Sequence, residues 1–215
     1  MDDDTAQAVP FLDSFWALAT PVPHERSQAA ASLAMHLADD AERSPYALKR
    51  LCRGLCSPRP GARQGFGAAL ATALAASEAL ALDDVVSALR EATTPSGRGG
   101  TRTSELRELH LGRLLGVHAV ARSGRVARAR DAPVEGAVGE LAAMTAELMR
   151  RRRWLRELCA VALVDLAAQT RAGARAAILT PELLGPLCEG ARDAAEAAAA
   201  QLALALGLQR VAPRA

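Results

Sequence analysis

Apolar residues recur along this chain of 215 residues at the spacing that is typical of amphipathic α-helices. In such a helix one side faces the core, so apolar positions follow the i, i+3, i+4, i+7 rule. Two clear sets are Ala30, Leu33, Ala34 and Leu37, and then Leu48, Leu51, Cys52 and Leu55. We find no convincing strand pattern. The sequence therefore predicts an all-α protein.

Prolines and short polar segments divide this pattern into about ten predicted helices. Pro10 can begin the first helix, Pro21 and Pro23 separate it from the second, and Ser44 with Pro45 begins the third. The predicted helices cover 11–19, 24–40, Ser44 to Leu55, a segment around Phe66 to Leu74, 83–92, 104–122, 134–150, 152–170, 181–189 and 191–206.

The stretch 94–103, TPSGRGGTRT, contains small and polar residues without apolar periodicity. It predicts a flexible loop between two helical parts, 10–93 and 104–208. We expect a disordered N-terminus over 1–9 and a tail over 209–215. The alanine-rich sequence before that tail supplies little bulk for a core, which indicates either a frayed cap or the cut end of a longer solenoid, and we expect a fragment.

Helices of this length, joined by short turns, can pair in antiparallel fashion and stack into a solenoid of the armadillo or HEAT type. A strict sequence period is absent, so this prediction rests on the pairing of helices. Aromatic residues make up only 3% of the chain, so its core must consist of small contacts between closely spaced helices. Gly112 and Gly116, four residues apart, allow such a close approach.

The net charge of +2 is too small to indicate nucleic-acid binding by itself. Lys49 is the only lysine, and the predominance of arginine suits planar, bidentate contacts but also fits a GC-rich genome. The N-terminus lacks the features of a secretory signal, and the apolar stretches are too short to span a membrane. A reducing compartment is expected, because the cysteines lie in predicted helices: Cys52, Cys56, Cys159 and Cys188.

Four blocks follow one another between Phe11 and Leu166: FLDSFWALATPVPHERSQAAASLAMHL, YALKRLCRGLCSPRPGARQGFGAALATAL, GRLLGVHAVARSG and RRRWLRELC. In this order they resemble the N-terminal region of the Myb-binding protein 1A family, which is also called DNA polymerase V or polymerase phi. The resemblance implies an armadillo-like scaffold of the nucleus and nucleolus that acts in ribosomal DNA transcription and ribosome biogenesis. In animals it also implies transcriptional co-regulation. Family members are much longer and carry acidic and basic tails.

Arginines are the best candidates for contacts with a partner. The candidate residues are Arg50, Arg53 and Arg63, with Lys49 and Arg59 nearby, and then Arg150, Arg151, Arg152, Arg153 and Arg156. On a solenoid they could line a ridge or groove that binds phosphates or an acidic protein. The alternative is a solvated face with local ion pairs, such as Arg156 with Glu157. We expect Trp154 to be a core anchor rather than a base-stacking platform, because apolar residues follow it at helical spacing.

No catalytic, metal-binding or cofactor-binding residue is predicted. Polymerase chemistry needs clustered carboxylates that hold metal ions, and the only pairs, Asp39 with Asp40 and Asp83 with Asp84, fall at predicted helix ends. Cys52 and Cys56 are one helical turn apart but have no further ligands nearby, so we expect small core residues. The histidines are scattered and form no recognisable catalytic arrangement.

The sequence therefore favours a non-catalytic scaffold that holds protein partners in nucleolar or transcription complexes. Direct binding of DNA or RNA through the arginine surfaces is the first alternative, and salt dependence would distinguish it. A nucleotidyltransferase is a distant third. We expect no membrane association and no small-molecule substrate.

Overall fold

A computed structural model describes residues 9–95, 102–128 and 134–171, together with isolated positions between 175 and 211. In these residues the chain forms nine α-helices and two 3-10 helices, and no strand. They are α1 (Phe11–Ala17), α2 (Pro23–Asp39), η1 (Ala41–Arg43), α3 (Ser44–Leu55), α4 (Pro60–Ala76), α5 (Leu82–Thr93), α6 (Thr103–Arg122), α7 (Arg125–Arg128), α8 (Glu135–Arg151), η2 (Arg153–Leu155) and α9 (Arg156–Gln169).

The helix boundaries follow from local sequence. Proline lies in the first turn of α2, α3 and α4, where its missing N–H group leaves no helical bond unmade. Asp40 follows α2 and caps the start of η1, because its carboxylate accepts a hydrogen bond from the backbone N–H of Glu42. After α6, Gly124 takes a φ of 67°, a conformation that side chains disfavour, and the chain turns there into α7.

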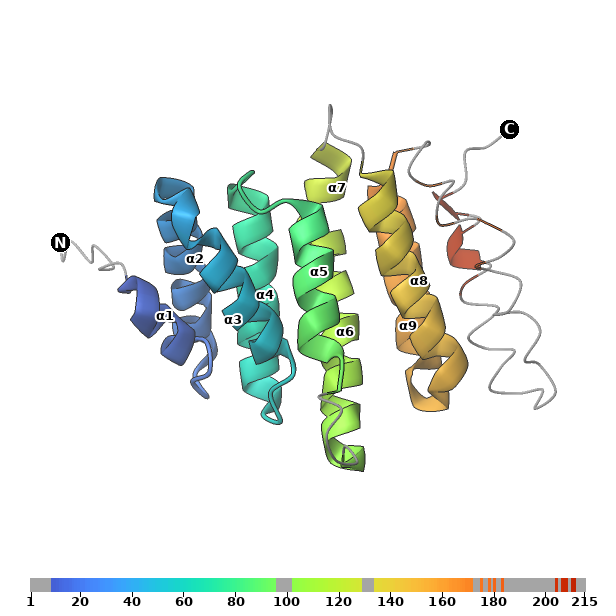
Figure 1. Cartoon of the computed structure of the whole chain (residues 1–215), viewed down its shortest axis with the longest axis horizontal. Helices are drawn as coiled ribbons and strands as arrows, with labels where there is room; N and C mark the ends of the chain where they lie inside the picture. The colour runs from blue at the N-terminus through green and yellow to red at the C-terminus, as the bar shows by residue number, and fades with distance from the viewer. Residues whose placement is uncertain are drawn as a thin grey trace.

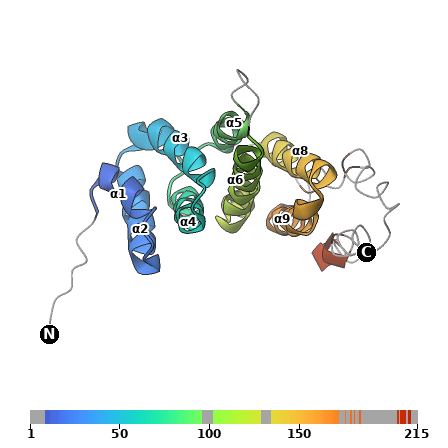
Figure 2. The same cartoon turned by 90° about the horizontal axis from the view of Figure 1, so that it is seen from below.

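The helices stand side by side in two rows (Figures 1 and 2). One row consists of α2, α4, α6 and α9, each of which packs against the next, and the other contains α3, α5 and α8. Cross-row pairs α3 with α4, α5 with α6, and α8 with α9 join the rows, while α1 packs on α2. Each pair runs antiparallel and buries its apolar side against its neighbours, so the predicted helical-repeat solenoid is confirmed.

Leucine and alanine form most of the core between the rows, as their abundance predicts. Leu33, Leu51, Leu70 and Leu89 are fully buried. The glycines of α6 mark close helix approaches, because a Cβ atom at Gly116 would overlap the side chain of Leu89 on α5. A Cβ atom at Gly112 would overlap Cys56, at the end of α3.

One apolar side chain does not lie where the sequence analysis placed it. Trp154, expected to anchor the core, is 46% exposed. The apolar face that follows it turns inward through Leu155, Cys159, Ala162 and Leu166, which are fully buried, while Leu158 is exposed. Trp154 lies in the 3-10 helix η2 and not in α9. The tighter 3-10 turn rotates its side chain away from the direction that a continuous α-helix would give it.

The remaining boundaries agree within a few residues where they can be compared. Val9, assigned to the N-terminal tail, is held on α2 because its N–H donates to Ser32 and its carbonyl lies 2.8 Å from a ring nitrogen of His36. Thr103, assigned to the loop, already belongs to α6. Most of the predicted loop and of the predicted helices 181–189 and 191–206 lie outside the described residues. Among the described helices, none has both the length and the apolar character needed to span a bilayer.

A basic cleft at one end of the helices

Several chain segments meet at the lower end of the helices in Figure 1: the turn from α3 to α4, the first turns of α6, and the end of α8 with η2. Between them lies a cleft of about 690 Å³, which we call the basic cleft. Its lining residues are Pro58, Arg63, Thr103, Ser104, Leu106, Arg107, Glu108, His110, Leu111, Arg152 and Trp154. Three arginines and one histidine therefore face a single carboxylate.

The arginines of the basic cleft have little neutralising charge around them. Arg63 donates to the carbonyl of Ser57 at 2.6 Å, which fixes its position but leaves its charge unpaired. The guanidinium carbon of Arg107 lies 5.1 Å from the ring centre of Trp154. Among the described residues, no carboxylate lies within 4.0 Å of the guanidinium groups of Arg63, Arg107 or Arg152. The cleft is thus a site of positive potential.

Two further observations indicate this potential. The Nε atom of Arg152 is buried and finds no hydrogen-bond partner among the described residues. The pKa of His110 is lowered by burial and, in smaller measure, by the positive charges of Arg152 and Arg113, with Glu147 acting in the opposite direction. An anion near these groups would relieve both the unmade hydrogen bond and the repulsion.

Arg113 stands beside the cleft as its structural support. Its Nε atom donates to Thr93 Oγ1 at 3.1 Å, and its side chain pairs with Glu147 at 3.4 Å, so it ties α6 to the ends of α5 and α8. Arg151 pairs with the same carboxylate at 3.3 Å. Burial lowers the pKa of Arg113 and Glu147 raises it. These two arginines share a carboxylate partner, in contrast to those of the cleft.

The structure separates the arginines that the sequence grouped together. Arg63 and Arg152, which are far apart in sequence, line the same cleft. Arg50 instead packs on aromatic rings of α1 and α3, and Arg53 lies 4.0 Å from Glu91. The positions of the other predicted contact residues are as follows: Arg150 lines a separate depression with Arg90 and Arg113, Arg153 is exposed at the start of η2, and Arg156 donates to the carbonyl of Met149.

Sequence reasoning missed Arg107, His110 and Arg113 as neighbours of the predicted arginines. They are spaced three residues apart on α6 and therefore project from neighbouring turns on one side of that helix. This spacing was visible in the sequence. What the sequence could not show is that the end of α8 lies against this side of α6.

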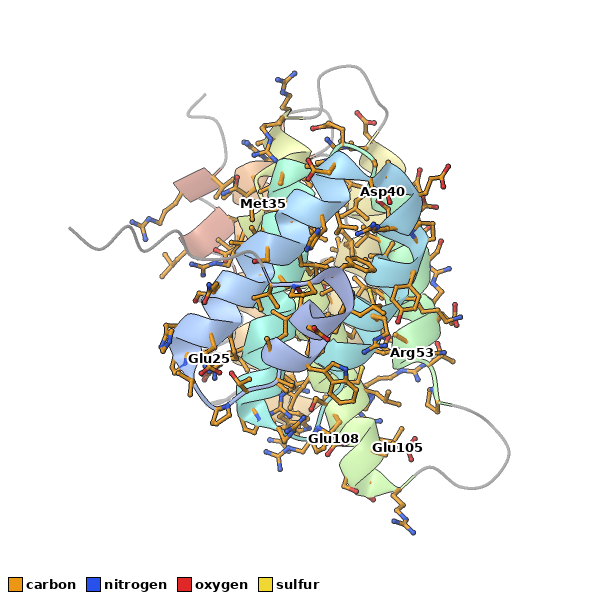
Figure 3. All side chains as sticks on the ribbon, turned by 90° about the vertical axis from the view of Figure 1, so that its left-hand side faces the viewer. Glu25, Met35, Asp40, Arg53, Glu105 and Glu108 are labelled. Carbon is orange, nitrogen blue, oxygen red and sulfur yellow. The ribbon has the colours of Figure 1, made fainter. Side chains whose placement is uncertain are left out.

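The acidic pairs occupy the opposite end of the molecule. Asp40 lies at the upper end in Figure 3 and Glu108, of the basic cleft, at the lower end. Asp40 caps η1 and pairs with Arg43 at 2.8 Å, while Asp83 and Asp84 lie in the first turn of α5, where the helix dipole favours negative charge. No group of three or more histidine, cysteine, aspartate or glutamate side chains that could hold a metal ion occurs in the part of the chain that the structure describes.

The three cysteines in the part of the chain that the structure describes pack as small residues. Cys52 and Cys159 are fully buried, and Cys56 is half-buried against Gly112. Burial raises the pKa of Cys52 and Cys159 to about 12 and, with the nearby charge of Glu108, that of Cys56 to about 11, while Arg113 lowers the latter. The core interpretation of Cys52 and Cys56 therefore agrees with their positions.

These features define a class of protein: a helical-repeat protein with a positively charged cleft at one end of its helices. The model of the family described as DNA polymerase phi matches residues 46–215, and the chain belongs to this family. The family predicted from the four sequence blocks is thus confirmed.

Curated relatives agree with this assignment. Myb-binding protein 1A-like protein of Danio rerio is 29% identical over 163 residues, which cover 74% of this chain and 12% of that protein. Myb-binding protein 1A of Mus musculus is 33% identical over 125 residues, 57% of this chain and 9% of the relative. The rDNA transcriptional regulator pol5 of Schizosaccharomyces pombe is 27% identical over 158 residues, 74% and 16% respectively. The chain thus spans less than a fifth of the length of each of these relatives.

Proposed function

We propose that this chain is a non-catalytic helical scaffold that regulates ribosomal DNA transcription in the nucleolus, with a further role in ribosome biogenesis. Membership in the DNA polymerase phi family supports this proposal, as does its similarity to a protein named rDNA transcriptional regulator. The relatives named Myb-binding protein support a function through macromolecular partners. In this proposal the basic cleft is the surface that holds such a partner.

The observation that carries the proposed binding role is the convergence of Arg63, Arg107 and Arg152 on one cleft. They come from α4, α6 and the residue after α8, and each lacks a carboxylate partner among the described residues. Bringing several positive charges close together without negative partners destabilises the folded state. A cluster of this kind is typical of a binding site for an anionic partner rather than of a packing element.

The acidic residues support a non-catalytic role. Asp40 is engaged in capping η1 and in its ion pair with Arg43, and Asp83 with Asp84 begins α5. Each pair thus has a structural explanation in its own helix. They lie at the end of the molecule away from the basic cleft, so they do not face the surface where an anionic template would bind.

The test is replacement of the full-length protein in cells that carry its gene, with pulse labelling of precursor ribosomal RNA as the readout. Depletion should change the rate of precursor synthesis, and wild-type protein should restore it. A triple variant, Arg63→Gln, Arg107→Gln and Arg152→Gln, should fail to restore it. The matched control is Arg43→Gln, Arg53→Gln and Arg90→Gln, which removes the same charge from arginines that lie beside carboxylates. An unchanged synthesis rate after depletion would refute the proposal.

Direct contact with nucleic acid is the second candidate function, and the unpaired charge of the basic cleft favours it over a purely protein-binding scaffold. Phosphate contacts release counterions, so affinity would fall steeply with salt. Binding of labelled DNA and RNA at two salt concentrations separates this candidate from the first.

A further inference from the structure

The positive charge of the basic cleft does not explain why Trp154, which lines it, is half-exposed. It lies in η2, between the end of α8 and the start of α9, and 46% of its surface is open to solvent. Large aromatic side chains usually gain stability by burial, and the neighbouring Leu155 is fully buried. Trp154 therefore presents a flat ring to the cleft instead of filling the core.

The surroundings of Trp154 suit a planar ligand that carries negative charge. Arg107 lies over its ring at 5.1 Å, and Arg63 and Arg152 line the same cleft. Leu106 and Leu111 add apolar surface to the lining. The combination of an accessible aromatic ring with several arginines is how proteins bind single-stranded nucleic acids, in which bases stack on the ring and phosphates contact the cations.

We propose that the basic cleft binds a short segment of single-stranded nucleic acid, with a base stacked on Trp154 and neighbouring phosphates held by Arg63, Arg107 and Arg152. This inference rests on the proposed function for its biological setting, and it specifies the ligand class of the same cleft. A duplex is disfavoured, because its bases are stacked on one another and cannot reach a side chain inside a cleft. An acidic peptide would use the arginines but would leave the exposed indole without a role.

The first experiment measures fluorescence anisotropy of labelled single-stranded RNA, single-stranded DNA and the corresponding duplex, titrated with the purified chain. Both single strands should bind more tightly than the duplex, and the comparison of RNA with DNA shows whether the 2′-hydroxyl contributes. Trp154→Ala should weaken binding between about 5-fold and about 150-fold, the range expected for one stacked base. Trp154→Phe should retain most of the affinity, because a smaller ring can still stack.

Trp16→Ala is the matched control, since this tryptophan is 75% exposed on α1, the first helix of the solenoid, and does not line the cleft. It should leave affinity unchanged. The salt dependence of binding tests the phosphate contacts separately. The slope of log K against log salt concentration becomes shallower by about 0.7 for each phosphate contact that a single strand loses. The triple arginine variant should therefore show a shallower slope than wild type, whereas Trp154→Ala should keep the wild-type slope.

A second experiment detects stacking directly. The chain contains two tryptophans, so Trp16→Phe leaves Trp154 as the only indole fluorophore. Single-stranded oligonucleotide should quench its fluorescence, and a polyglutamate peptide of equal charge should not. This readout would not respond to a merely structural role of Trp154.

Three results would overturn the inference: equal affinity of Trp154→Ala and wild type, preference for the duplex, or polyglutamate binding as tightly as the oligonucleotide. The last would identify an acidic protein segment as the partner. These outcomes are independent of the cellular test, because loss of precursor RNA synthesis on depletion would still support the proposed function if the cleft failed to bind single strands. Conversely, binding without any cellular effect would leave the ligand assignment intact and refute the function.

Discussion

Two regions of the molecule, the aromatic cluster beside α1 and the basic cleft, place an arginine on an aromatic ring in opposite ways. Near α1, the guanidinium carbon of Arg50 lies 4.9 Å from the ring centre of Phe15 and 5.7 Å from that of Tyr46. Nη1 of Arg50 also donates a hydrogen bond to the hydroxyl of Tyr46 at 2.9 Å. Phe11 completes this aromatic cluster with edge contacts to Phe15. In the basic cleft, Arg107 lies over Trp154 at a similar distance, 5.1 Å, but the ring has no other aromatic neighbour among the described residues.

The difference lies in burial. Phe15 is 2% exposed, so Arg50 covers a ring that already belongs to the core, and its alkyl stem and charge both serve packing. Trp154 is 46% exposed, and the arginines around it have no carboxylate partners in the described part of the chain. The same pairing of residue types therefore stabilises the fold in the aromatic cluster and forms an open site in the basic cleft.

The largest expected effect on stability comes from the aromatic cluster. Phe15→Ala should lower the free energy of unfolding by about 3–5 kcal/mol, because it removes a fully packed ring and leaves a cavity. Trp154→Ala should lower it by only about 1 kcal/mol, since much of the ring is already solvated. Urea unfolding of both variants measures the difference. An equally large loss for Trp154→Ala would show that this residue supports the core, and the contrast between the two regions would fail.

The next largest effect on stability is expected where α6 packs closely against α5. Gly116→Ala should destabilise the protein by about 1–3 kcal/mol, because the new methyl group would overlap Leu89. Gly136→Ala, on α8, is the control, since nothing lies within 4 Å of the added atom. It should stabilise by about 0.5–1 kcal/mol through helix propensity. Thermal unfolding of the two variants should shift in opposite directions, and a shift in the same direction would contradict the packing at Gly116.

A smaller effect distinguishes the two stacked arginines. Arg50→Ala should cost about 1 kcal/mol of stability through its lost ring contacts and hydrogen bond. Arg107→Ala should change stability by less than about 0.5 kcal/mol, as is usual for exposed positions, yet it should weaken oligonucleotide binding. Paired measurements of unfolding and anisotropy check both statements. If Arg50→Ala weakened binding instead, the site would extend to the aromatic cluster.

The smallest effect is a pH dependence in the cleft. Because the folded protein lowers the pKa of His110, the unfolded chain binds more protons below the ordinary value of about 6.5. The stabilising effect of a neutral His110 is thus present above that value and is lost as the pH falls through it toward the folded pKa. Arg152 and Arg113 oppose protonation and Glu147 favours it. Unfolding at pH 7.5 and 5.5 should show a smaller loss for His110→Gln than for wild type.

His118 is the internal comparison for this measurement. Burial lowers its pKa as well, and Asp165, 3.7 Å away, raises it. His118→Gln should therefore reduce the acid-induced loss by its own share, independently of His110. A loss that is identical in wild type and in both variants would contradict the lowered pKa values.

Most of the fold could be predicted from the sequence, because proline positions and apolar periodicity are local signals. Pro23, Pro45 and Pro60 lie in the first turns of their helices, and the spacing from Leu48 to Leu55 shows the face that is buried. The position of Trp154 could not be predicted in this way. It depends on a 3-10 turn at the start of the segment 152–170, which the sequence predicted as one continuous helix.

The candidate site was predictable only in part. Arg63 and Arg152 belonged to two predicted arginine groups, but the sequence contains no signal that joins them or that separates them from Arg50 and Arg53. Their separation follows from tertiary neighbours: Glu91 lies beside Arg53, whereas no comparable carboxylate reaches Arg152 among the described residues. Runs of arginine in the sequence show where positive charge is present. The packing of the helices determines which of these arginines lack a carboxylate partner.

The buried thiols of Cys52 and Cys159 can report separately on the opening of the first and the last part of the solenoid. Cys52 belongs to α3 and Cys159 to α9, and with pKa values of about 12 neither is a thiolate nucleophile at neutral pH while its helix stays closed. Alkylation of each must then wait for its own helix to open. In a solenoid, where each repeat contacts only its neighbours, the two ends can open at different rates. Pulse alkylation, with the two cysteine peptides distinguished by mass, would therefore measure the opening rates of α3 and of α9 separately.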